Sequence, residues 1–272
     1  MSLFSDDNIT AALQQRDRVC ETSPLVKGPL FEKVSQIMQE PFPLLERLAL
    51  WSCDSAVLVL PSTFLGGSAP RLRVLHLDGI AFSALPRLLS STSDLVELQL
   101  QRVPSSGYIS PEALVGGLSA TARLKTLYLH FDPATSHSDP KNTPPPSSGR
   151  IVFSTLTEFI IEGTCNYLED LLSRISAPSL EHALISFFDL PSFDDVCQLS
   201  QFLSRVEPQR LPDLVEVKLC EPAGTSLSYP RSRALPRGLS WLVASLNHPF
   251  PRLELSLITH ICQQISPFLS SV

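Results

Sequence analysis

An apolar triplet of the form Leu-x-x-Leu-x-Leu recurs seven times along the chain in one reading frame. The copies are Leu45/Leu48/Leu50, Leu72/Leu75/Leu77, Leu95/Leu98/Leu100, Leu124/Leu127/Leu129, Leu156/Phe159/Ile161, Leu180/Ala183/Ile185 and Leu214/Val217/Leu219. Their first residues lie 27, 23, 29, 32, 24 and 34 positions apart. A fixed apolar frame at this period is typical of leucine-rich repeats, in which each unit buries its apolar side by stacking on its neighbours. The pattern predicts an α/β leucine-rich-repeat solenoid with seven clear repeats and degenerate terminal ones.

The stretches between the triplets change to the i, i+3, i+4 spacing of amphipathic helices. Leu85, Leu88 and Leu89 form one such set, and Ser110 offers an N-cap just before Pro111. Parallel strands need crossover connections, which are usually helical. The alternation therefore predicts a curved parallel sheet on the concave side and helices on the convex side.

The repeats add to one continuous core, so we expect a single domain over residues 1–272. A Pro/Ser-rich stretch without periodicity, 132–150, is expected to be a flexible insertion. Irregular terminal repeats are expected at 1–40 and 225–272. The first of these is predicted to begin near Asp17, because Val19 precedes Leu45 by 26 residues, and to contain a helix over Leu30–Met38.

Composition narrows the classes of function. The formal net charge is -6 and no run of Lys and Arg occurs, so the chain lacks the basic field that nucleic-acid binding needs. Asp6 and Asp7 stand where a secretory signal would be apolar, and no stretch of eighteen apolar residues suggests a membrane span. We therefore expect an intracellular protein, in the cytoplasm or nucleus, that binds neither nucleic acid nor membrane.

Six cysteines lack the paired spacing of a zinc site or a disulfide framework. Cys53 follows the first triplet where this repeat class often places Asn or Cys, so its thiol is expected to cap backbone groups in the turn. Gly66-Gly67 and Gly116-Gly117 are expected to relieve the turns at helix ends.

The residues between the leucines project from the concave sheet, because side chains alternate along a strand. They are the candidate partner-binding residues: Arg47, Trp51, His76, Asp78, Glu97, Gln99, Gln101, Tyr128, His130, Glu158 and Glu162. Trp51 and Tyr128 are the best hot-spot candidates, since aromatic side chains give large contact areas. The alternative, that both aromatics only cover neighbouring strand surface, stays open.

Catalysis is not expected, and no cofactor or metal is implied. His76 and His130 lie two repeats apart without a third ligand between them, so a solvated histidine is favoured over a metal site. The chain has no Gly-rich phosphate loop and no G-x-S-x-G elbow.

Several phrases together resemble the leucine-rich-repeat region of the F-box-like protein family of mushroom-forming fungi. They are Ile9–Glu21 (ITAALQQRDRVCE), Met38–Leu45 (MQEPFPLL), Leu60–Leu77 (LPSTFLGGSAPRLRVLHL), Gly107–Leu118 (GYISPEALVGGL) and Tyr167–Ile175 (YLEDLLSRI). The resemblance implies a substrate receptor of a cullin-based ubiquitin ligase, in which an F-box docks the adaptor and the repeats hold the target. No F-box is recognisable in this chain, because the first forty residues contain no Leu-Pro. An adaptor is therefore expected as a partner only if an F-box exists outside these residues.

The expected function is a non-catalytic protein-interaction module that recognises a protein target through its concave sheet. One alternative is a truncated fragment of a longer F-box and leucine-rich-repeat protein with no independent activity. A remoter alternative is an enzyme with a site on the loops after the strands, which would need convergent titratable groups.

Overall fold

The computed structural model describes residues 6–52, 54, 56–131, 150–187, 197–206, 214–219 and 242–246. It divides into two compact units, Met1–Thr143 and Pro144–Val272. The division falls within the predicted insertion at 132–150. The prediction of a single domain stays a prediction, and each unit is described by itself.

The first unit alternates strands with short helices. Its helices are α1 (Asp6–Leu13), α2 (Gly28–Ile37), α3 (Leu85–Leu89) and α4 (Pro111–Leu118), with 3-10 helices at Arg16–Arg18, Phe64–Gly67 and Ser105–Gly107. Its strands are β1 (Glu21–Thr22), β2 (Leu25–Val26), β3 (Arg47–Ser52), β4 (Leu58–Val59), β5 (Val74–Asp78), β6 (Ile80–Ala81), β7 (Glu97–Val103) and β8 (Thr126–Phe131). Strands β1, β3, β5, β7 and β8 follow one another in a parallel sheet, while β2 also pairs with β3 and β4 pairs with β6.

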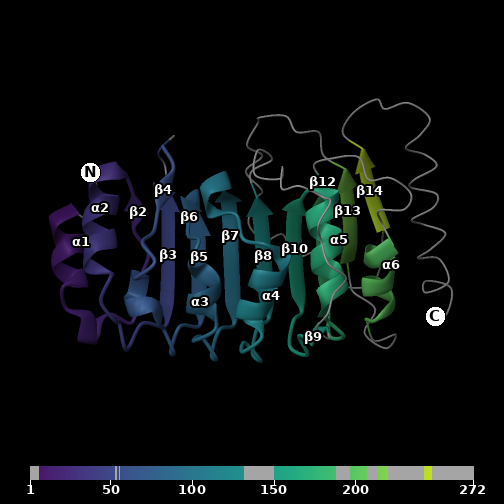
Figure 1. The fold of residues 1–272 in the computed structure, drawn as a ribbon, viewed down its shortest axis with the longest axis horizontal. Coiled ribbons are helices and arrows are strands. Elements are labelled where there is room, and N and C mark those ends of the chain that lie inside the picture. Colours follow the sequence, from purple (N-terminus) through teal and green to yellow (C-terminus); the bar gives the residue numbers. More distant parts are fainter. Residues whose placement is uncertain are drawn as a thin grey trace. The chain divides into compact units, whose positions relative to one another are not determined.

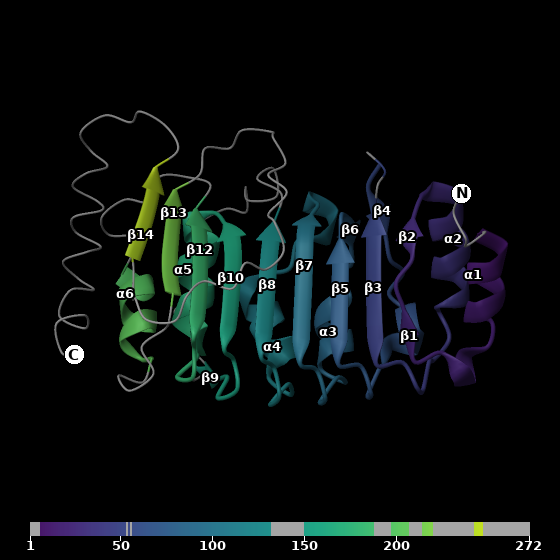
Figure 2. The same cartoon turned by 180° about the vertical axis from the view of Figure 1, so that it is seen from behind.

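Helices α3 and α4 lie on one face of this sheet, and Figure 2 shows the strands in front of them from the other side. The triplet leucines lie in the core between the two layers. Leu48, Leu75, Leu98 and Leu127 occupy equivalent positions of neighbouring strands, and none is more than 1% exposed. The predicted frame is thus confirmed for the first four triplets, because register and burial agree.

The second unit repeats the arrangement. Its elements are β9 (Ile151–Val152), β10 (Glu158–Gly163), α5 (Cys165–Arg174), β11 (Ile175–Ser176), β12 (His182–Phe187), α6 (Cys197–Ser204), β13 (Leu214–Leu219) and β14 (Leu242–Leu246) (Figure 1). Strands β10, β12, β13 and β14 form a parallel sheet in that order, and β9 pairs with β11. The predicted α/β class with a parallel sheet therefore holds in both units.

The predicted frame of the seventh triplet is wrong by two residues. Ala183 pairs with Val215 and Ile185 with Val217, whereas the triplet had placed them beside Val217 and Leu219. Apolar residues alternate along β13, and a shift by two positions keeps every side chain on the same face. The pattern alone therefore left this register open.

Within 225–272, where an irregular terminal repeat is expected, the structure describes β14, which continues the sheet of the second unit. It pairs with β13 in parallel, with Leu219 beside Leu246. The apolar stretch Leu253–Ile258 lies outside the described residues, as does Cys53 with its predicted cap.

The degenerate first repeat is confirmed in its register. Glu21 pairs with Arg47 and Leu25 with Trp51, an offset of 26 residues in both cases (47 − 21 and 51 − 25). The two strands β1 and β2 are one interrupted strand, because Pro24 between them has no N–H for the sheet. The predicted helix over Leu30–Met38 is observed as α2.

Side chains cap the N-termini of α4 and α2. Ser110 accepts a hydrogen bond from the Ala113 N–H at the start of α4, as predicted. The Asp54 carboxylate accepts one from the Gly28 N–H at the start of α2, 26 residues earlier. A carboxylate suits this place because the helix N-terminus carries partial positive charge.

Gly117 has a different role from the predicted relief of a turn. It lies inside the last turn of α4, where a Cβ atom would stand 2.7 Å from the Pro86 backbone oxygen and 2.9 Å from the Pro86 Cα atom. The absence of a side chain thus lets α4 approach α3. Gly116, its neighbour, would have no heavy atom within 4 Å of such a Cβ.

These neighbouring glycines give opposite expectations for one substitution. Gly117→Ala should destabilise the fold by roughly 1 to 3 kcal/mol, because the added methyl meets backbone that must move. Gly116→Ala should be neutral or stabilise by up to about 1 kcal/mol, since alanine favours the helix. Urea unfolding of both variants checks this, and equal midpoints would contradict the close packing of α4 on α3.

Candidate functional site

The sheet face of the first unit opposite α3 and α4, here called the open face, holds the predicted candidates of that unit. Its residues form three rows across β3, β5, β7 and β8: Arg47, Val74, Glu97 and Thr126; Ala49, His76, Gln99 and Tyr128; Trp51, Asp78 and Gln101, with His130 at the end of β8. Most are half-buried, while the leucines between them are buried. The first two predicted rows are confirmed within this unit, and so is the third from Trp51 to Gln101, because alternation and register place the same residues side by side.

A chain of side-chain hydrogen bonds links the middle of the open face. The Glu97 Oε1 atom lies 3.0 Å from His76 Nε2 and accepts from Gln99 Nε2 at 2.6 Å. Gln101 Nε2 donates in turn to Gln99 Oε1 at 3.2 Å. These long side chains are therefore held in place by one another, which reduces the rotamer entropy that a partner would otherwise have to remove.

The pKa of Glu97 is lowered below its usual value of 4.5. The hydrogen bond from His76 is the largest cause, and electrostatic attraction to His76, the hydrogen bond from Gln99 and attraction to Arg47 act in the same direction. Partial burial opposes them by disfavouring the charged form. The open face therefore carries an ionised carboxylate at neutral pH.

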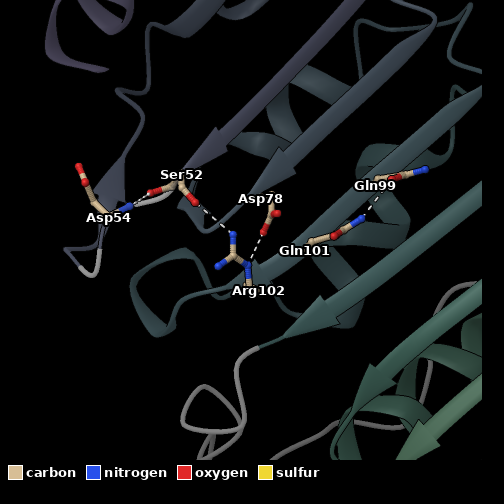
Figure 3. A network of polar contacts seen from close by, with 6 residues as sticks. All are labelled: Ser52, Asp54, Asp78, Gln99, Gln101 and Arg102. Atoms are coloured by element: carbon tan, nitrogen blue, oxygen red, sulfur yellow. Dashed lines mark hydrogen bonds and ion pairs between the residues drawn. The ribbon is translucent and has the colours of Figure 1, made fainter. Parts of the chain in front are cut away.

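Arg102 joins the carboxyl ends of three strands (Figure 3). Its Nε donates to Asp78 Oδ1 at 2.6 Å, and its Nη2 donates to the backbone oxygen of Ser52 at 3.1 Å. The residue has φ 46°, in the left-handed region that a non-glycine residue adopts at a cost of roughly 1 to 2 kcal/mol. The arginine thus holds β3, β5 and β7 together at the end where the rows terminate.

Strict alternation would have placed Arg102 in the core, and it was not among the predicted residues. The register of β7 and β8 shifts between Leu100 and Val103, which is the sign of a β-bulge. The bulge turns Arg102 outward and returns Val103 to the core. The sequence does carry a signal for the bulge. Arg102 is charged at a position where strict alternation predicts a buried apolar residue, and Val103 is apolar at the next position, where alternation predicts an outward-facing one.

The two predicted hot-spot aromatics are not neighbours. Trp51 lies beside Leu25 of β2, whereas Tyr128 lies beside Gln99 on the far side of β5 and β7. Three strand steps and two residues along the strands separate the two aromatics, which is roughly 16 Å. Each can therefore contact a different part of a partner.

The candidates of the second unit differ in exposure. Glu158 is half-buried and pairs with His182, but Glu162 is only 5% exposed and lies beside the fully buried Ser186. The expectation that Glu162 projects into solvent is wrong, because the carboxyl ends of β10 and β12 are buried on both faces. That the faces of the two units form one surface stays a prediction.

Among residues with described positions, no group of three or more His, Cys, Asp or Glu side chains is placed to hold a metal ion. His76 and His130 lie two strand steps apart, with β7 between them. None of the described helices combines the length and apolarity required to cross a lipid bilayer.

No protein-family model matches the chain, and no curated protein matches it either. Function is therefore inferred from the open face itself.

Two substitutions of Arg102 distinguish the stability that its side-chain contacts provide from the cost of its backbone conformation. Arg102→Ala and Arg102→Gly both lose the contacts with Asp78 and Ser52, but only glycine adopts a positive φ without a steric penalty. Arg102→Gly should be the more stable of the two by roughly 0.5 to 1 kcal/mol. This difference is the free-energy penalty that alanine pays in the left-handed conformation, minus the free energy of the extra conformational entropy that glycine loses on folding. Urea unfolding measures the difference, and a more stable alanine variant would argue against the bulge.

Stability should depend on Glu97 through pH. Because its pKa is lowered in the folded state, the ionised carboxylate stabilises the fold above pH 4.5, and this contribution is lost as pH falls through the folded-state pKa. The difference in unfolding free energy between wild type and Glu97→Gln should therefore shrink below about pH 4.5. A His76→Ala background should reduce this pH dependence, and a pH-independent difference would show that His76 does not act on Glu97.

Proposed function

We propose that the protein is a non-catalytic recognition module that binds a protein partner through the open face. The observation that carries this proposal is the chain of hydrogen bonds from His76 through Glu97 and Gln99 to Gln101, on a sheet face opposite the helices. Half-exposed side chains that are ordered in advance suit recognition, because less entropy is lost on binding.

We further propose that both units are parts of a leucine-rich-repeat solenoid. In support, successive strands of the first unit pair at offsets of 27, 23 and 29 residues: Leu48 with Leu75, Leu75 with Leu98, and Leu98 with Leu127. These offsets lie in the range of such repeats. In that fold the strands line a concave surface, so the open face would be its inner side.

The chemistry of the open face favours binding over catalysis. His76 and Glu97 form a histidine–carboxylate pair, and in hydrolases such a pair activates a nucleophile because the carboxylate orients the histidine as a general base. Within the described residues, the hydrogen bond of His76 is to Glu97, and no serine, threonine or cysteine side chain donates to the imidazole. The pair therefore orders the surface and does not activate a nucleophile.

Charge on the open face also favours protein over nucleic acid. Glu21, Asp78 and Glu97 are carboxylates, against the guanidinium groups of Arg47 and Arg102. Such a balance repels phosphates, because nucleic-acid binding requires an excess of basic groups.

The resemblance to F-box-like proteins suggests that the partner is a target for ubiquitination. This part of the proposal applies only to a protein that carries an F-box outside these 272 residues. Target binding by the open face is independent of it.

Selection from a displayed library of random peptides tests the recognition role. Binders obtained with the wild type should bind the Trp51→Ala/Tyr128→Ala variant at least tenfold more weakly, because truncating aromatic side chains that contact a partner removes about 1.4 kcal/mol or more. The matched control is Arg87→Ala/Glu112→Ala, which changes two exposed side chains on α3 and α4. Equal affinity for the aromatic variant, or equal loss in the control, would reject the open face as the binding surface.

A further inference from the structure

We infer that the open face of the first unit takes an extended polypeptide segment that presents a lysine or arginine side chain to Glu97 and an apolar side chain to Leu25 and Trp51. This inference rests on the proposed recognition role and specifies the chemistry of its partner. It follows from the carboxylate of Glu97, the apolar pair of Leu25 and Trp51, and the amide groups of Gln99 and Gln101 on the same face.

Glu97 is the carboxylate of the open face that has no ion pair with a Lys or Arg of the described residues. Arg47 lies 3.8 Å from Glu21, and Arg102 lies 2.6 Å from Asp78. The ion pair that Glu97 makes within the described residues is with His76, and only when the imidazole is protonated, while Arg47 attracts the carboxylate without forming an ion pair with it. The face is therefore complementary to one added cation at this position.

The geometry of Glu97 suits such a contact. Its Oε1 atom takes part in both hydrogen bonds, with His76 and with Gln99, while Oε2 has no hydrogen-bond partner in the described part of the chain. Its side chain is 28% exposed. A partner's ammonium or guanidinium group can thus bind Oε2 without breaking the existing bonds, and such charge-assisted hydrogen bonds are stronger than neutral ones.

An apolar contact lies at the opposite corner of the same face. Leu25 is 53% exposed and is the register neighbour of the half-buried Trp51. An aliphatic side chain laid on this pair would remove apolar surface from water at roughly 25 cal/mol per Å². This corner therefore favours a partner that is apolar at one position and basic at another.

The separation of the two contacts fits an extended segment. Glu97 lies two strands from Trp51 and four residues from the row that Trp51 shares with Gln101, so the diagonal is roughly 16 Å by strand geometry, or about five extended residues. His76 lies at the middle of this diagonal, and Gln99 and Gln101 lie beside it on β7. The Gln101 Oε1 atom has no hydrogen-bond partner among the described residues. Such amide groups can bond the main chain of a polypeptide, which a small cation lacks.

The test uses the random-peptide library with the full chain. Peptides that depend on Trp51 and Tyr128 should be enriched in lysine or arginine about five positions from an apolar residue. Replacing that basic residue by glutamine should weaken binding at least tenfold, and affinity should fall as salt rises from 50 to 500 mM because the contact is ionic.

Variants of the protein identify the acceptor. Glu97→Gln keeps the shape and an acceptor atom but removes the charge, and should weaken the same peptides at least tenfold. Glu46→Gln is the control, because Glu46 is an exposed carboxylate that lies 3.8 Å from Arg73 and outside the three rows. It should leave affinity within twofold.

The outcomes separate the two proposals. Peptides that need Trp51 and Tyr128 but show no basic preference, no salt dependence and no loss with Glu97→Gln would overturn this inference and leave the recognition role intact. Peptides that ignore Trp51 and Tyr128, or a library without any binder, would overturn both. Salt dependence is measured on the wild type, so the inference can fail even if Glu97→Gln does not fold.

Discussion

Stacking of leucines between neighbouring parallel strands is the interaction on which the first unit depends. Leu48, Leu75, Leu98 and Leu127 lie in one line across the sheet and are buried. One strand with its helix has too little surface to bury these side chains alone, so each repeat is stabilised by the next. The register must therefore be held at every step, since a slip of one residue would turn the leucines toward solvent.

The same constraint creates the open face. Because side chains alternate along a strand, burying the leucines places the residues between them on the other side of the sheet. These positions need not fill the core, and His76, Glu97 and Gln99 occupy them with polar groups that bond one another. The surface proposed for recognition is thus a geometric consequence of the core, while its chemistry is free to vary.

The carboxyl ends of the strands depend on a local departure from this regularity. At Arg102 the alternation breaks, and the backbone adopts a conformation that is costly for a side-chain-bearing residue. The ion pair with Asp78 and the hydrogen bond to Ser52 offset that cost. Through these two contacts, Arg102 connects three strands beside the open face, although its backbone is strained.

The sequence by itself determined the apolar face of most strands and helices, because alternation and helical spacing are local patterns. It placed Leu98 in the core, set the 26-residue offset of the first repeat and predicted Ser110 as a helix cap. It did not determine the register at Val217, since a shift by two keeps the same face buried. Only the tertiary structure decided that Gly117 lets α4 pack closely on α3, that Glu97 forms a hydrogen bond with His76 and that Arg102 connects three strands. Those contacts join segments more than twenty residues apart, and their geometry depends on how the strands pair.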